Sequence, residues 1–133
     1  MMSIKYAIVK PSKEVLKRGF FVEAVLILNP DNSRTIIFHL LFNQYCDGDK
    51  NTRYEWRYEE NTLILTQIFE ADMVPRCSEP YETFGVIEDV SLDSLNISFF
   101  KFEYNNKYLK RMSVSETKSF SKNDNVVTIL GIT

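Results

Sequence analysis

The chain has 133 residues, of which 44% are hydrophobic and 26% charged, and its formal net charge is −2. This length and composition predict one folded domain over residues 1–133 and exclude an intrinsically disordered chain. The apolar runs are too short to cross a bilayer as helices, and Lys5 and Lys10 interrupt the N-terminal run where a secretory signal needs apolar residues. We therefore expect a cytoplasmic protein that does not enter a membrane, with Cys46 and Cys77 as free thiols.

The first elements expected along the chain are a strand at residues 4–9 and one short helix at residues 12–18. The hydroxyl of Ser12 can cap this helix by accepting a hydrogen bond from a free backbone N–H group, and Gly19 can end it. A longer helix over residues 12–28 is the alternative, because the run is apolar on every side, but its β-branched and aromatic residues favour a strand after Gly19. One short helix is therefore expected.

The rest of the chain is predicted to consist of strands joined by tight turns, because apolar residues recur with a period of two between clusters of Asn, Asp and Pro. These strands are expected at residues 20–28, 35–42, 53–59, 63–70, 83–90, 95–104, 108–117 and 126–132. Residues 46–52 and 71–82 are expected to be loops. The fold class is therefore mostly β, an antiparallel meander of eight to nine strands curled into a barrel or half-barrel, with one short N-terminal helix.

Charge is unevenly distributed along the chain. Residues 45–99 carry twelve acidic and four basic side chains, a net charge of −8, whereas residues 1–44 and 100–133 each have a net charge of +3. An acidic segment repels phosphate backbones, so nucleic-acid binding is not expected. The same segment would attract a basic protein. The simpler alternative is that these carboxylates form an ordinary solvated surface.

Residues 54–59 alternate aromatic and charged side chains. In a strand, Tyr54, Trp56 and Tyr58 share one face, and Arg57 lies on the other. The aromatic face is expected to point inward, as part of a filled core or as the wall of a cavity. Trp56 should then be mostly buried and Arg57 exposed.

Residues 54–112 show three features in order: Trp56 before a hairpin, the sequence Leu-Asp-Ser-Leu at residues 92–95, and the basic residue Arg111 late in the segment. In this order they resemble the C-terminal half of small bacterial lipocalin-like (calycin) β-barrel domains. The resemblance implies a meander barrel, and members of this group often hold an apolar ligand. The residues expected in its core or cavity wall are Tyr54, Trp56, Tyr58, Phe100, Phe102 and Arg111.

The sequence has no catalytic or metal-binding signature. His39, the only histidine, has no nucleophile motif near it and is expected to be a hydrogen-bonded histidine of a sheet. Residues 47–51 are similar to the start of a calcium loop, but Thr52 stands where that loop requires glycine. The adjacent carboxylates of Glu59–Glu60 and of Glu88–Asp89 should point to opposite faces of a strand, so neither pair forms an acid–base dyad. We expect no enzymatic activity, no cofactor and no metal.

Two functions fit this pattern. The first is a non-catalytic protein-binding inhibitor, most concretely a bacterial immunity protein that caps the basic cleft of a toxin, such as a nuclease, with carboxylates. Its candidate partner-binding residues are Asp47, Asp49, Glu55, Glu59, Glu60, Glu70, Asp72, Glu79 and Glu82. The second is an intracellular lipocalin-like carrier of an apolar small molecule, with Arg111 as the basic anchor for a ligand carboxylate.

Overall fold

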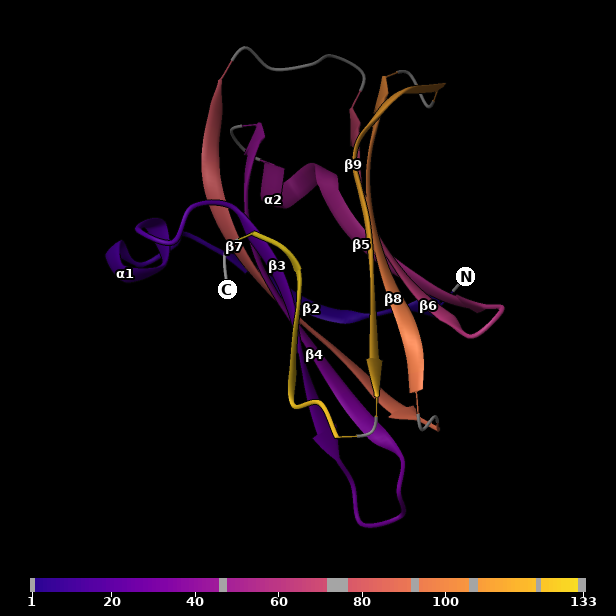
Figure 1. Ribbon diagram of the computed structural model, residues 1–133. Coiled ribbons are helices and arrows are strands. Elements are labelled where there is room, and N and C mark those ends of the chain that lie inside the picture. The colour runs from indigo at the N-terminus through magenta and orange to yellow at the C-terminus, as the bar shows by residue number, and fades with distance from the viewer. Residues whose placement is uncertain are drawn as a thin grey trace.

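The computed structural model describes residues 2–45, 48–71, 77–91, 94–105, 108–121 and 123–131. Two five-stranded sheets pack against each other (Figure 1). Sheet A has the order β1 (Met2–Ser3), β5 (Thr52–Glu59), β6 (Thr62–Ala71), β8 (Ser94–Asn105), β9 (Tyr108–Ser121). Sheet B has the order β10 (Val126–Leu130), β3 (Phe21–Leu28), β4 (Arg34–Tyr45), β7 (Ser78–Val90), β2 (Lys5–Val9). The short helices are α1 (Lys13–Leu16) and α2 (Gly48–Asn51).

Three local sequence signals are confirmed. Ser12 caps α1, because its hydroxyl accepts a hydrogen bond of 3.2 Å from the backbone N–H of Val15. The turn between β3 and β4 contains Asn32 with a φ of 69°, a left-handed conformation that asparagine tolerates. The turn between β5 and β6 consists of Glu60 and Asn61, with φ angles of 46° and 62°, as in tight two-residue hairpins. The fold is mostly β, as the alternation predicts.

The expected antiparallel meander is wrong between β6 and β8, because all of β6 pairs in parallel with residues 96–105 of β8. The intervening strand, β7, belongs to sheet B, so the chain leaves sheet A after β6 and re-enters it in the same direction. The two sheets are open, and the described strands do not close into a barrel. The alternation of apolar residues identifies strands but not their partners, which is why the topology was mispredicted. In addition, the one-turn helix α2 lies in a segment that was expected to be a loop.

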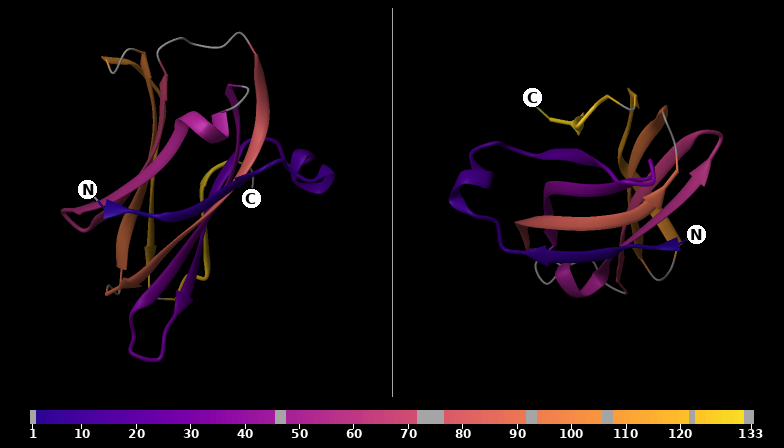
Figure 2. Two further views of the ribbon diagram at one scale, coloured as in Figure 1. Left: turned by 180° about the vertical axis from the view of Figure 1, so that it is seen from behind. Right: turned by 90° about the horizontal axis from the view of Figure 1, so that it is seen from below.

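The N-terminal segment links the two sheets along one side (Figure 2). β1 pairs with β5 in sheet A, β2 pairs with β7 in sheet B, and Ile4 between them is buried in the core. A Cβ atom at Gly85 of β7 would lie 2.8 Å from Cδ1 of Ile4, so a larger residue at position 85 would have to displace the end of the Ile4 side chain. β9 is an edge strand of sheet A and β10 is an edge strand of sheet B. No pairing between described strands joins these two edges.

The inner faces of both sheets form one hydrophobic core. Phe42 of sheet B stacks on Phe99 of sheet A, with ring centroids 5.6 Å apart. The hydroxyl of Tyr54 bonds to Gln67 within sheet A and to Thr83 of sheet B, 3.1 Å away, so a buried polar link also joins the sheets. The core side chains include Val22, Leu26, Ile36, Phe38, Leu40, Phe42, Tyr54, Leu63, Leu65, Ile87, Ile97, Phe99, Phe120 and Ile129.

β7 begins at Ser78, inside the segment that was expected to be a loop because of its prolines. Pro80 lies opposite Asn43 of β4, and β2 ends at Val9, opposite Glu82. The side of β7 away from β4 therefore has no strand partner at Pro80, and a residue without an N–H group is tolerated there. None of the described helices is long and apolar enough to span a membrane.

Cys77 is disulfide-bonded, so the prediction of a free thiol at this position is wrong. The other cysteine of the sequence, Cys46, lies outside the described residues. Disulfides persist in oxidising compartments and are rare in the cytoplasm. The bonded state of Cys77 therefore counts against the cytoplasmic location that we expected.

Candidate functional site

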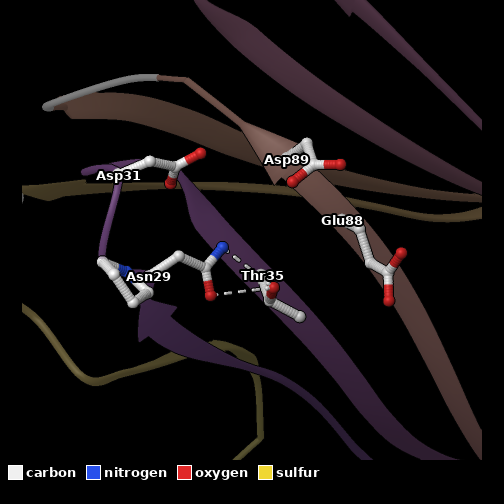
Figure 3. Close-up of a pocket in the computed structure, with 6 residues that line it drawn as sticks. Asn29, Asp31, Thr35, Glu88 and Asp89 are labelled. Atoms are coloured by element: carbon white, nitrogen blue, oxygen red, sulfur yellow. Dashed lines mark hydrogen bonds between the residues drawn. The ribbon is translucent and has the colours of Figure 1, made fainter.

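A shallow hollow of about 410 Å³ lies on the protein surface between the β3–β4 turn and the end of β7 (Figure 3). It is lined by Asn29, Pro30, Asp31, Thr35, Glu88 and Asp89. Three of these six residues are carboxylates, and none is basic. The hollow was not predicted from the sequence as a site.

Hydrogen bonds within the turn hold one wall of the hollow in place. The side-chain amide of Asn29 donates to Oγ1 of Thr35 at 3.1 Å, and the Oγ1 hydroxyl donates back to the Asn29 oxygen (Figure 3). The carboxylate of Asp31 accepts from the hydroxyl and from the backbone N–H of Ser33, at 2.6 and 3.0 Å. These hydrogen bonds from Ser33, the hydroxyl first, hold the pKa of Asp31 below its ordinary value, so the carboxylate stays ionised at neutral pH.

A β-bulge places the other two carboxylates at the same hollow. Arg34 of β4 pairs with Val90 of β7, whereas Ile36 pairs with Ile87, so only Thr35 lies opposite both Glu88 and Asp89. Asp89 has a φ of 60°, a left-handed conformation that aspartate tolerates better than most residues. The prediction that Glu88 and Asp89 point to opposite faces of a regular strand is wrong, because the bulge interrupts the alternation and both residues line the hollow.

The charge of the hollow is not neutralised within the described part of the chain. No ion pair joins Asp31, Glu88 or Asp89 to a described lysine or arginine. Glu88 and Asp89 are exposed to solvent. The described acidic, cysteine and histidine residues nowhere form a group of three that could hold a metal ion. The hollow therefore offers negative charge and hydrogen-bond acceptors to a partner from outside.

A second polar cluster lies on the outer face of sheet B. His39 of β4 stands between two carboxylates: its Nδ1 is 3.0 Å from Glu23 of β3, and its Nε2 contacts Glu82 of β7. Its ring stacks on Phe84 with centroids 4.4 Å apart. Arg18, which follows α1, donates two hydrogen bonds to Glu23, at 3.0 and 3.2 Å. His39 is thus a hydrogen-bonded sheet histidine, as expected.

The pKa of Glu23 predicts how the stability of the protein changes in acid. The hydrogen bonds from Arg18, and secondarily the one with His39, lower this pKa from its ordinary value. A depressed carboxyl pKa contributes stability that is present above the unfolded-state value and is lost as the pH falls through the lower folded-state value. Glu23→Gln should therefore lose less stability than the wild type between about pH 5 and pH 3. Urea unfolding at four pH values checks this, and parallel curves for the two proteins would contradict it.

The seven described carboxylates of the nine that were predicted to bind a partner lie on both sheets, in a turn and in α2. Arg53 pairs with Glu55 at 3.4 Å and with Glu70 at 3.3 Å, and Arg57 pairs with Glu59 at 3.3 Å, all within sheet A. Four more of the nine lie in the described residues: Glu60 is exposed in the β5–β6 turn, Glu79 accepts from the hydroxyl of Tyr81, Glu82 contacts His39, and Asp49 is part of α2. Asp47 and Asp72 lie outside the described residues.

The predicted wall residues lie on both faces of sheet A. Tyr54 is buried, Trp56 is partly buried against the core, and Tyr58 is exposed, so burial decreases along the aromatic face of β5. Phe100 and Phe102 stack on each other outside the core cluster, on the face of β8 opposite Phe99. The side chain of Arg111 lies outside the described part of the chain.

Comparison of the chain with protein families, with curated proteins and with solved structures finds no match. The resemblance of residues 54–112 to lipocalin-like domains therefore stays a prediction.

Proposed function

We propose that the protein is a non-catalytic inhibitor that binds a basic protein, as a bacterial immunity protein binds its toxin. The observation that supports this is the hollow lined by Asp31, Glu88 and Asp89, whose carboxylates have no basic partner among the described residues. A basic cleft, such as the substrate-binding cleft of a nuclease, is the complementary surface.

The geometry favours recognition of a lysine or arginine side chain. Asp31 is fixed by its two hydrogen bonds with Ser33, and Glu88 and Asp89 are placed by the bulge rather than by flexible loop residues. Groups held in position before binding lose less entropy when the partner arrives. Carboxylates at such a place form charge-assisted hydrogen bonds with a guanidinium or ammonium group and increase the rate of association through their long-range field.

Two other features of the chain bear on this proposal. Glu60, exposed in the β5–β6 turn, adds to the negative field without forming an ion pair of its own in the described structure. The disulfide-bonded Cys77 favours an inhibitor that meets its partner in an oxidising compartment. The carrier function has no comparable support, because Tyr54 is hydrogen-bonded in the core and Phe100 lies outside it.

The probe for this test is the C-terminal domain of a secreted protein that the neighbouring reading frame encodes. We expect the purified domain to bind this protein, and we expect Asp31→Asn together with Glu88→Gln to lower the association rate about tenfold at low salt. Asparagine at position 31 keeps an acceptor for Ser33, so the turn is preserved. Stopped-flow binding at two ionic strengths measures the effect.

The matched control is Glu14→Gln, which removes one exposed carboxylate from α1, away from the β3–β4 turn (Figure 1). This variant should associate at the wild-type rate. Binding that is independent of salt would contradict an electrostatic interface, and equal effects of the hollow variant and of Glu14→Gln would show that the hollow is not the contact. If the probe domain neither binds nor is inhibited, the proposed function is wrong.

A further inference from the structure

The longest strand of the protein lies at an open edge. β9 has 14 residues, pairs with β8 on one side and ends the strand order of sheet A. The other sheet edges are short, because β1 has two residues and β2 and β10 have five each. A strand with a free edge presents a row of backbone N–H and C=O groups that can pair with a further strand.

The part of β9 next to β10 remains accessible. A groove of about 290 Å³ lies there, lined by Glu116 and Lys118 of β9 and by residues 128–131. Neither Glu116 nor Lys118 forms an ion pair with another described residue. Two opposite charges two positions apart on this edge therefore have no ion-pair partner among the described residues of one copy.

The sequence of this edge is complementary to itself when it is read in the opposite direction. Residues 114–120 are Val-Ser-Glu-Thr-Lys-Ser-Phe, which is apolar, Ser, acidic, Thr, basic, Ser, apolar. In an antiparallel pair of two such strands centred on Thr117, Glu116 of each copy lies opposite Lys118 of the other. Ser115 lies opposite Ser119, and the apolar positions 114 and 120 lie opposite each other.

Each of these cross-strand pairs is favourable. Side chains directly opposite each other in an antiparallel pair have Cβ atoms about 5 Å apart, close enough for an ion pair or a hydroxyl–hydroxyl hydrogen bond. Glu116 and Lys118 lie opposite Phe99 and Ile97 in the register with β8, on the face that points toward sheet B. The two ion pairs would thus form on the same face, next to the edge of the core, where water screens them less than on a fully exposed surface.

We propose that two copies of this chain pair through their β9 strands, antiparallel and around a two-fold axis at Thr117, to form one continuous ten-stranded sheet. A two-fold axis requires a self-complementary surface, which residues 114–120 supply. This interface is separate from the hollow between the β3–β4 turn and β7, so it does not depend on the proposed inhibitor function.

Charge reversal at the two positions tests the proposal. Glu116→Lys places lysine opposite lysine twice, and Lys118→Glu places glutamate opposite glutamate twice. We expect each variant to raise the dimer dissociation constant about tenfold or more in sedimentation equilibrium. An equimolar mixture of the two variants should form a heterodimer with wild-type affinity, because every lysine then faces a glutamate. The double variant with both reversals should also dimerise as the wild type does.

Recovery in the mixture also shows that the single variants fold. Glu14→Lys and Lys13→Glu on α1 make the same changes in net charge outside β9 and should leave the dissociation constant unchanged. A wild-type protein that is monomeric at millimolar concentration would overturn the proposal. A dimer that is insensitive to both reversals would also overturn it, because the interface would then lie elsewhere.

Discussion

Replacing Phe99 with alanine is expected to lower the free energy of unfolding by about 3–5 kcal/mol, the range for truncating a large aromatic side chain in a core. Phe99 is fully buried, stacks on Phe42 of the opposite sheet and pairs with Leu65 in the parallel register of sheet A. Its removal would leave a cavity at the contact between the two sheets. Urea unfolding followed by circular dichroism measures the change.

Phe100→Ala is the matched control, because it makes the same truncation one residue along β8. Phe100 is only partly buried and stacks on Phe102 on the outer face of sheet A. Phe100→Ala should lower the free energy of unfolding by less than half as much as Phe99→Ala, since less apolar surface is buried at Phe100. Equal costs for the two variants would contradict the orientation of β8 in the structure.

The same pair of residues shows where sequence reasoning succeeds and where it stops. The alternation of residues 95–104 correctly indicates a strand, but both Phe99 and Phe100 are aromatic, so the pattern does not decide which face is buried. The interpretation that placed Phe100 and Phe102 in the core is therefore not supported by the packing, which buries Phe99 with Ile97. The contacts that decide this come from β4 in the other sheet, which is distant in sequence.

Local features were predictable because their causes are local. The cap at Ser12 and the turns at Asn32 and at Glu60–Asn61 depend on a few adjacent residues whose hydrogen bonding and φ preferences are known. The parallel pairing of β6 with β8 depends on β7 joining the other sheet, which no short segment encodes. A feature that depends on adjacent residues can thus be predicted from the sequence, whereas a strand pairing that depends on distant segments cannot.

The candidate site was missed for a similar reason. Asp31 was identified as a turn residue and Glu88–Asp89 as a pair of carboxylates, but a bulge opposite Thr35 is needed to bring them to one hollow. The signal for the bulge that the sequence offered was Asp89, because aspartate tolerates the left-handed backbone conformation that it adopts there. Conversely, a net charge of −8 over residues 45–99 overstated the free negative charge, because Arg53 and Arg57 pair with three of its carboxylates.

Glu82→Ala is the second substitution for which we expect a large effect, a loss of about 3 kcal/mol of stability. Glu82 is buried on the outer face of sheet B, where it contacts Nε2 of His39. Removing Glu82 is costly because Nε2 of His39 loses its hydrogen-bond partner while it stays largely shielded from water. Glu88→Ala, the same change on the same strand, should alter stability by no more than about 0.5 kcal/mol, since Glu88 is exposed and unpaired in the described structure.

A double-mutant cycle decides whether the effect of Glu82 acts through the histidine. His39→Leu removes the partner of both carboxylates, and in that background Glu82→Ala should cost at least about 1 kcal/mol less than in the wild type, because contacting residues of one network are coupled. Arg18 still holds Glu23 in both backgrounds, so Glu23 keeps a cationic partner throughout. If Glu82→Ala costs the same with and without His39, then the contact between them does not stabilise the fold, and the cost of the truncation comes from lost packing around Phe84 instead.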